Sequence, residues 1–129
     1  MVRNGVLLVA GVAGTLALGL TSGVATAGDA EAGKKVFAKC AVCHVVDKPQ
    51  NKVGPTLHGV IGRPAGTVEG FKYSDAMKNS GLVWDEATLD AYLENPKEHV
   101  KGTKMAFAGL KKPEDRANVI AYIAEASKN

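Results

Sequence analysis

The chain has 129 residues, of which 22% are charged, and its formal net charge at pH 7 is +3. This length fits one small domain. A net charge so close to zero excludes functions that need a strongly basic surface, such as general binding of nucleic acids, so any electrostatic recognition must come from the placement of charges.

Residues 1–27 are predicted to be a cleaved signal peptide. Arg3 supplies a positive start, residues 6–20 form an apolar stretch without charge or proline, and Ala25-Thr26-Ala27 is a suitable cleavage site. The alternative is a retained membrane anchor, but a membrane-spanning helix needs about 20 apolar residues, more than this stretch provides. We therefore expect a mature domain of residues 28–129 that is exported to the periplasm.

The first helix of this domain is expected to run from Asp29 toward Cys40. Asp29 is a good N-cap, and Glu31 lies in the first turn, where a negative charge is favourable. Val36, Phe37 and Cys40 recur at the spacing of one helical face. This face is predicted to point into the core.

The sequence Cys40-Ala41-Val42-Cys43-His44 follows on this helix. The pattern C-x-x-C-H is typical of covalent haem attachment. Each thiol can form a thioether with one vinyl group of the haem, and the histidine can bind the iron through Nε2. In an oxidising compartment free thiols do not persist, which agrees with this interpretation.

The motif has three other interpretations. A redox dithiol is expected in a βαβ context, and the pattern here is helical. A zinc site needs two more ligands, and the other histidines, His58 and His99, lack the usual ligand spacing. A plain disulfide would leave His44 without a role.

Residues 45–70 are predicted to form an irregular loop, because three prolines and five glycines interrupt them. A short helix is expected from Ser74 or Asp75 to Ser80, ended by Gly81. No pair of strands is predicted.

Two further helices are better marked. One is capped by Asp85 and stops at Asn95-Pro96, with Trp84 placed to pack on Leu89 as a hydrophobic staple. The last begins near Pro113 and carries an apolar stripe formed by Val119, Ile120, Ile123 and Ala124. The predicted fold class is therefore all-α, with several helices and long loops. A domain this small has little core of its own, so a large apolar cofactor at its centre would stabilise it.

The residue in the second axial position of the iron would decide the function. A strong ligand there makes an electron carrier, whereas an open position favours a gas-binding protein or a haem enzyme. The candidates are Met77, Met105, His58, His99 and nearby lysines. Met77 lies in a predicted helix, where methionine more often fills core volume, while Met105 lies in a non-periodic stretch. The residues favour Met105 and leave Met77 open.

Several motifs in order make the mature chain resemble the small class I c-type cytochromes, both bacterial periplasmic cytochrome c2 and mitochondrial cytochrome c. These motifs are Gly28-Asp29, Cys40–His44, Gly54-Pro55-x-Leu57-x-Gly59, Gly62-Arg63, Phe71-x-Tyr73, Trp84, Tyr92-Leu93-Glu94-Asn95-Pro96 and Gly102-Thr103-Lys104-Met105-x-Phe107-Ala108-Gly109. The resemblance covers nearly all of residues 28–129. It implies the small cytochrome c fold, wrapped around one haem c that is covalently bound through Cys40 and Cys43.

The resemblance also implies an axial ligand pair. His44 would be the proximal ligand and Met105 the distal one. The Pro55 carbonyl would accept a hydrogen bond from His44 Nδ1 and fix the tautomer of the ring. Thr103 and Tyr92 would lie near the Met105 sulfur.

Other residues receive roles from the same resemblance. Arg63, Tyr73 and Trp84 would neutralise or hydrogen-bond a haem propionate, whose charge could not be buried alone. Gly33 and Phe37 would pack against the last helix.

One position departs from the family pattern. Mitochondrial members carry an asparagine near a buried water where this chain has Met77. Two hypotheses follow: Met77 alters the water network and the reduction potential, or it only fills volume.

The implied function is that of a soluble one-electron carrier rather than an enzyme. It would be a monomer that shuttles electrons from a cytochrome bc1-type complex to a photosynthetic reaction centre or terminal oxidase. Docking would use lysines around the haem edge, namely Lys39, Lys52, Lys97, Lys104, Lys111 and Lys112. The alternative is a haem enzyme or gas-binding protein with an open or labile sixth iron ligand.

Overall fold

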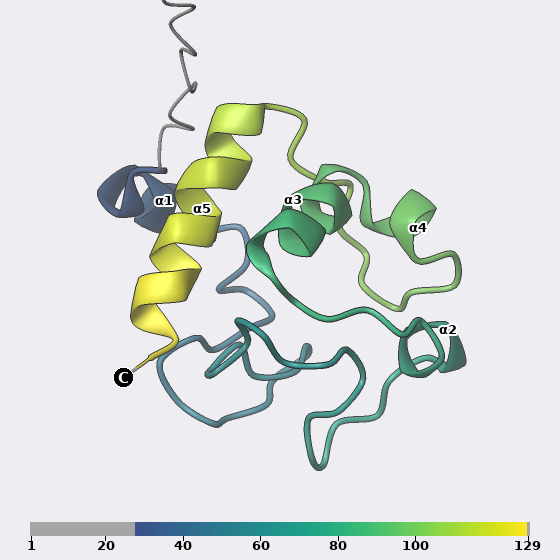
Figure 1. The fold of residues 1–129 in the computed structure, drawn as a ribbon. Coiled ribbons are helices and arrows are strands. Elements are labelled where there is room, and N and C mark those ends of the chain that lie inside the picture. Colours follow the sequence, from purple (N-terminus) through teal and green to yellow (C-terminus); the bar gives the residue numbers. More distant parts are fainter. Residues whose placement is uncertain (1–27, 129) are drawn as a thin grey trace, which may run out of the picture.

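The computed structural model describes residues 28–128, so the predicted signal peptide lies outside the described residues. Five helices follow in chain order: α1 (Ala30–Phe37), α2 (Asp75–Lys78), α3 (Glu86–Glu94), α4 (Pro96–His99) and α5 (Pro113–Ala126). Figure 1 shows α1, α3 and α5 grouped together, with α2 and α4 beyond α3. Within the described residues there is no strand, only an isolated β-bridge between Pro64 and Val83, which confirms the all-α prediction.

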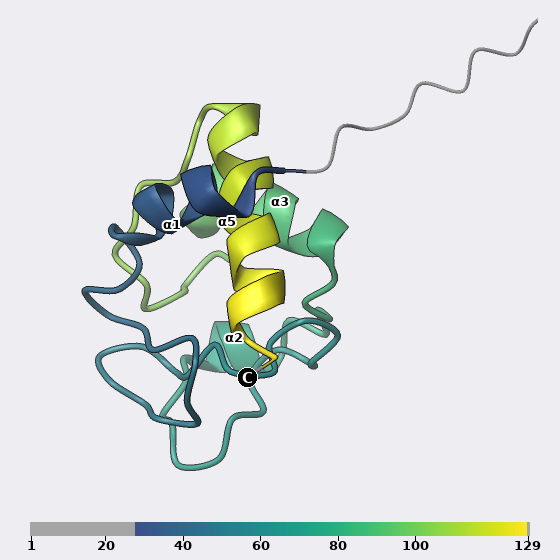
Figure 2. The ribbon, with the colours of Figure 1, turned by 90° about the vertical axis from the view of Figure 1, so that its left-hand side faces the viewer.

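Helices α1 and α5 cross one another, as Figure 2 shows most clearly. Their close approach depends on Gly33, because a Cβ atom there would collide with the backbone carbonyl of Asn118. Beside this contact the rings of Phe37 and Tyr122 lie 5.1 Å apart, centre to centre. Asn118 also accepts a hydrogen bond from Asp29 N at 2.8 Å. The expected packing of Gly33 and Phe37 on the last helix is therefore present.

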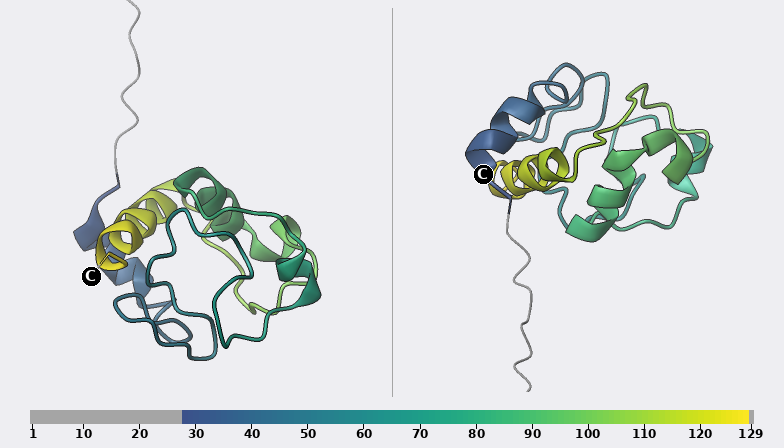
Figure 3. Two further views of the ribbon diagram at one scale, coloured as in Figure 1. Left: turned by 60° about the horizontal axis from the view of Figure 1, so that its bottom comes forward. Right: turned by 90° about the horizontal axis from the view of Figure 1, so that it is seen from above.

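The segment between α1 and α2 carries no helix of its own and is a loop, as the density of proline and glycine predicts. Figure 3 shows this segment passing around the side of the molecule away from α3 and α5. Backbone hydrogen bonds join it to the rest of the fold, from Gly59 N to Ser127 O, Gly62 N to Trp84 O, and Ala65 N to Leu82 O. These bonds give a non-repetitive segment a defined path.

The first three helices have side-chain N-caps; Asp29 and Asp85 are the predicted ones, and Ser74 settles the start that the sequence left open between Ser74 and Asp75. Asp29 accepts from the backbone N–H groups of residues 31 and 32, Ser74 from that of Met77, and Asp85 from that of Thr88. Each side chain satisfies a donor that the first helical turn leaves without a partner. Hydrogen bonding to Thr88 also holds the pKa of the Asp85 carboxyl below its usual value.

Two helix ends and one additional helix differ from the predictions. α1 ends at Phe37 rather than near Cys40, because the next N–H groups bond to carbonyls three residues back and tighten the chain into turns. α2 ends at Lys78 rather than Ser80, whose hydroxyl donates to the Met77 carbonyl at 2.8 Å. α4 was not predicted: Pro96 ends α3, but it also sits at the first position of a new helical turn.

The core lies where α3 and α5 meet the loops. Val119, Ile120 and Ile123 of α5 are buried together with Leu89 and Leu93 of α3, in agreement with the predicted stripe. Within residues 28–128, no helix has the length and apolar character that crossing a membrane requires.

Candidate functional site

The His44 side chain is held by the loop that follows it. Its Nδ1 lies 2.8 Å from the Pro55 carbonyl oxygen. Because a carbonyl can only accept, the proton is on Nδ1, and Nε2 keeps its lone pair for a metal. Burial lowers the pKa of His44, which favours the same neutral form. The arrangement suits an axial imidazole ligand.

Gly54 lies directly against the His44 ring. A Cβ atom on Gly54 would stand 2.7 Å from Nδ1 and 2.8 Å from Nε2, and closer still to Cε1. The Gly54 N–H also donates to the Cys43 carbonyl at 2.8 Å. The sequence alone does not reveal that Gly54 contacts the His44 ring. The only signal for this contact is the pair Gly54-Pro55 after the histidine.

The two cysteines are half-buried, and neither forms a disulfide. They lie in consecutive turns after α1, where Cys43 N and His44 N both donate to the Cys40 carbonyl. Burial raises the pKa of the Cys40 thiol to about 11, so at neutral pH this group is a neutral thiol. Within residues 28–128, no three His, Cys, Asp or Glu side chains gather into a metal site, so the zinc alternative lacks the further ligands that it requires.

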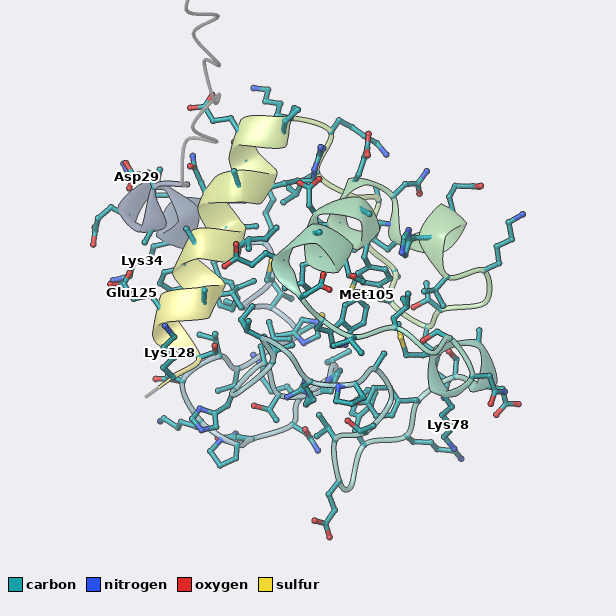
Figure 4. The ribbon with its side chains drawn as sticks, viewed as in Figure 1. Asp29, Lys34, Lys78, Met105, Glu125 and Lys128 are labelled. Atoms are coloured by element: carbon teal, nitrogen blue, oxygen red, sulfur yellow. The ribbon has the colours of Figure 1, made fainter. Side chains whose placement is uncertain are left out.

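Met105 lies in the loop between α4 and α5. In Figure 4 Met105 is labelled near the centre of the molecule, whereas Lys78 is labelled near its edge, beside α2. Met105 is half-buried and packs against the core. Its backbone N–H donates to Thr103 Oγ1 at 3.4 Å, and the same hydroxyl lies 3.2 Å from the Tyr92 hydroxyl. A residue of α3 thus fixes the start of the loop that carries the thioether.

Arg63, Tyr73 and Trp84 are brought together by the loops. Trp84 N donates to the Arg63 carbonyl at 2.9 Å, and the Trp84 ring lies 4.9 Å from that of Tyr92. The Arg63 guanidinium donates to the carbonyls of Thr56 and His58. Burial lowers the pKa of Arg63, and the nearby Tyr73 hydroxyl opposes this shift.

The polar groups around this region fit a bound haem. In the part of the chain that the structure describes, the one ion pair is Arg116 with Asp90, so half-buried Arg63 has no carboxylate of the protein to neutralise it. A haem propionate would supply that charge. The only buried side-chain nitrogen or oxygen atom without a partner among residues 28–128 is Nδ1 of His58. An imidazole with a free Nε2, two thiols and an uncompensated guanidinium together match an anionic iron porphyrin.

The other candidate iron ligands have different surroundings. Met77 is buried in α2 and belongs to the core cluster, so its packing is that of a side chain that fills volume. His99 is exposed at the end of α4, with its ring edge-on to Tyr92 at 6.2 Å. His58 is half-buried in the loop after Pro55.

Arg116 binds the end of the loop that carries Met105, a role that the sequence did not indicate. Its side chain is 7% exposed. It donates to Asp90 Oδ1 at 2.8 Å and to the carbonyls of Leu110 and Lys111 at 2.9 and 3.2 Å. One α5 side chain therefore joins α3 to the end of the loop, because a buried guanidinium needs several acceptors.

Known proteins are similar to this chain in sequence and in fold. The sequence model of the family described as cytochrome c matches residues 30–127. The chain belongs to the cytochrome c family. Like other members it is an electron-transfer protein and not an enzyme, and it carries covalently attached haem c, for which Cys40 and Cys43 provide the two thiols. Family membership thus agrees with the fit of the site residues to haem.

Individual relatives come from both bacteria and eukaryotes. The chain is 60% identical over 99 residues to a cytochrome c2 of Rhodomicrobium vannielii, covering 76% of this chain and 79% of that protein. It is 59% identical over 102 residues to cytochrome c type-1 of Ascaris suum, covering 78% and 91%. A solved structure of cytochrome cH from Methylobacterium extorquens superposes with a TM-score of 0.72 at 49% identity, covering 76% and 99%.

Proposed function

We propose that the protein is a periplasmic electron carrier whose haem iron is bound by His44 and Met105. The observation that carries this proposal is the hydrogen bond from His44 Nδ1 to the Pro55 carbonyl, at 2.8 Å. It leaves Nε2 as the free ligand atom and orients the ring. When bound, haem c supplies a one-electron ferric/ferrous couple.

The residues around the ligands would hold them in place. Thr103 and Tyr92 anchor the loop that delivers the Met105 thioether. A fixed ligand pair keeps rearrangement on electron transfer small, and a thioether ligand raises the reduction potential. With His44 and Met105 both bound to the iron, dioxygen and substrates would be kept from it.

Arg63, Tyr73 and Trp84 are proposed to bind a haem propionate. The support is the uncompensated Arg63 guanidinium, which is half-buried beside the other two residues. A buried carboxylate needs a counter-charge or hydrogen-bond donors, and this group offers both.

Docking is proposed to use exposed lysines and acidic partners. All six lysines of the predicted ring are exposed. Three are held by backbone carbonyls: Lys52 Nζ by Ala41 at 3.0 Å, Lys104 Nζ by Lys72 at 3.3 Å, and Lys111 Nζ by Glu94 at 2.7 Å. Positive charges in such positions steer the approach of an acidic surface. The partners are a cytochrome bc1-type donor and a reaction centre or terminal oxidase as acceptor.

The proposed route to the periplasm is export followed by removal of residues 1–27. The support is the order of Arg3, the apolar stretch and Ala25-Thr26-Ala27 in the sequence. The mature protein would begin at Gly28 and act as a monomer.

One preparation tests these proposals. The full chain is expressed in a bacterium that matures c-type cytochromes, and the coloured protein is sought in periplasmic and membrane fractions. We expect a soluble periplasmic protein whose mass corresponds to residues 28–129 plus one haem. Its reduction by a purified bc1 complex should be rapid at low salt. A haem protein retained in the membrane with residues 1–27 attached would contradict the export proposal, and failure to exchange electrons with the complex would contradict the carrier proposal.

A further inference from the structure

The loop that carries Met105 runs from α4 back past α3 to the start of α5 (Figure 1). Among the described residues, no backbone–backbone hydrogen bond joins residues 104–109 to any part of the fold. The Met105 N–H donates to a side chain, Thr103 Oγ1, at 3.4 Å. Because this segment lacks regular backbone pairing, the position of the thioether depends on how the two ends of the loop are held.

The start of the segment is held by side-chain contacts. The Tyr92 hydroxyl lies 3.2 Å from Thr103 Oγ1, whereas a hydrogen bond between two hydroxyl groups is usually about 2.8 Å long. The exposed Lys104 ammonium donates to a backbone carbonyl at 3.3 Å. Long contacts of this kind contribute little, so the start of the loop is weakly attached.

The end of the segment is held at Leu110, which is 4% exposed. The Leu110 N–H donates to the Leu93 carbonyl at 2.7 Å, and the Leu110 carbonyl accepts from Arg116 Nη1 at 2.9 Å. Gly109, the preceding residue, lies so close to α3 that a Cβ atom there would collide with the Glu94 carbonyl. The chain is therefore fixed at Gly109-Leu110 by backbone bonds, by burial and by close packing.

Arg116 completes this attachment because its charge is buried. Its guanidinium also donates to Asp90 Oδ1 at 2.8 Å and to the Lys111 carbonyl at 3.2 Å. A buried guanidinium that loses its acceptors is left with unpaired donors, which is costly, so small fluctuations do not break these bonds. Both ends of the loop thus meet the last turn of α3, but the end is held much more firmly than the start.

We propose that Arg116 is a positioning residue for the distal iron ligand: it fixes Gly109-Leu110 as the hinge about which the loop turns when Met105 leaves the iron, so that the loop opens at Thr103. This inference rests on the proposed function, since it requires Met105 as ligand. A fixed hinge leaves the open loop few conformations and returns the thioether to the same place. A loosened hinge raises the population of the open form, in which a small external ligand replaces Met105.

The test uses the mature haem protein and imidazole, a good iron ligand. Absorption spectra follow the binding of imidazole to the ferric form of the unaltered protein and of three variants. Arg116→Lys keeps the charge but loses the planar set of donors that reaches three acceptors. Asp90→Asn removes the ion pair and leaves the contact with Leu110. Gly33→Ala lowers stability at the crossing of α1 and α5, a contact in which the loop takes no part.

We expect Arg116→Lys to bind imidazole about tenfold more tightly than the unaltered protein, and the other two variants to stay within about twofold of it. Equal affinities in Arg116→Lys and the unaltered protein would overturn the inference. An equal gain in Gly33→Ala would overturn it as well, because overall stability alone would then set the affinity.

Amide hydrogen exchange of the unaltered protein tests the hinge even if Arg116→Lys does not mature. On addition of imidazole the Met105 N–H should exchange about tenfold faster or more, while the Leu110 N–H keeps its rate because the hinge stays closed. Faster exchange at Leu110 would overturn the inference and leave the proposed function intact. If the reduced unaltered protein takes up carbon monoxide at once, Met105 is not on the iron, and the proposed function and the inference fail together.

Discussion

His44 Nδ1 and the Pro55 carbonyl oxygen lie 2.8 Å apart, and Gly54, next to Pro55, leaves no room for a side chain beside the same ring. Gly54 does not have a positive φ angle. Glycine is therefore needed here for close approach and not for backbone conformation. The contact of Gly54 and Pro55 with the His44 ring therefore both orients the imidazole and packs the loop.

The variant Gly54→Ala should displace either the His44 ring or the loop. We expect a loss of stability of about 3 kcal/mol, because a methyl group is forced into a filled space. Gly59→Ala is the matched control: Gly59 has a positive φ of 67° but open space around it, so it should lose only about 1 kcal/mol. Denaturant unfolding of the two haem proteins gives the comparison, and equal losses would show that the ring contact is unimportant.

Gly33→Ala, at the crossing of α1 and α5, should lower stability as much as Gly54→Ala does. The new methyl group would meet the Asn118 carbonyl and stand 2.9 Å from Tyr122 Cβ. Because both helices would have to separate, we expect a loss of about 3 kcal/mol without a change in haem ligation. Thermal unfolding followed by circular dichroism measures it. A small effect would mean that the crossing adjusts more freely than the contacts indicate.

Tyr92→Phe should loosen the Met105 loop, since it removes the hydroxyl that lies 3.2 Å from Thr103 Oγ1. The expected cost is about 1 kcal/mol. In a double-mutant cycle, the stability losses of Tyr92→Phe and Thr103→Val should be less than additive, because the two substitutions remove the same hydrogen bond. Additive losses would argue against the bond.

The same variant has an effect that depends on pH. Burial raises the pKa of Tyr92 above its ordinary value of 10.0. Above that value the unfolded chain loses the Tyr92 proton before the folded protein does, so this group lowers stability as pH rises from about 10 toward the folded pKa. Tyr92→Phe should therefore show a weaker loss of stability with alkaline pH than the unaltered protein. Parallel curves from pH 9 upward would contradict this reasoning.

Arg116 and Asp90 should respond unequally to substitution. Asp90 is half exposed, so Asp90→Asn removes a solvent-screened charge and should cost less than about 1 kcal/mol. Arg116→Lys keeps the charge but cannot make the same set of bonds to Leu110 and Lys111, and should cost about 2 kcal/mol. Urea unfolding of both variants measures this difference. Losses in the opposite order would mean that the charge pair matters more than the carbonyl contacts.

Electron transfer to and from acidic partners should slow with added salt. Exposed charges such as Lys52 and Lys97 are screened beyond about 8 Å at physiological ionic strength. Lys97→Gln should lower the second-order rate at low salt and have little effect at high salt. Stopped-flow kinetics over a range of sodium chloride concentrations tests this, and a salt-independent rate would contradict steering.

The sequence predicted best those features that depend on neighbouring residues. The caps Asp29 and Asp85 each act within three residues of their own position, so the starts of α1 and α3 were predicted correctly, and the start of α2 lies within the predicted choice of Ser74 or Asp75. Pro96 was interpreted only as a stop, although proline also begins helices, and α4 was missed for that reason.

The features that sequence reasoning missed depend on distant contacts. Gly54 matters because its backbone pairs with Cys43 and brings it against a ring ten residues earlier. Arg116 matters because its acceptors lie on α3 and on a loop. Neither the residue type nor the local pattern reveals such partners, since they are set by how the chain folds back on itself.

The central claim is that His44 and Met105 close both faces of the haem, and it is tested most directly by absorption spectra of the purified periplasmic protein in both redox states, with carbon monoxide then added to the reduced form. We predict a reduced spectrum typical of haem c that carbon monoxide leaves unchanged, and ready formation of an adduct in Met105→Ala. A carbonyl adduct formed at once by the unaltered protein would contradict the claim and indicate an open site.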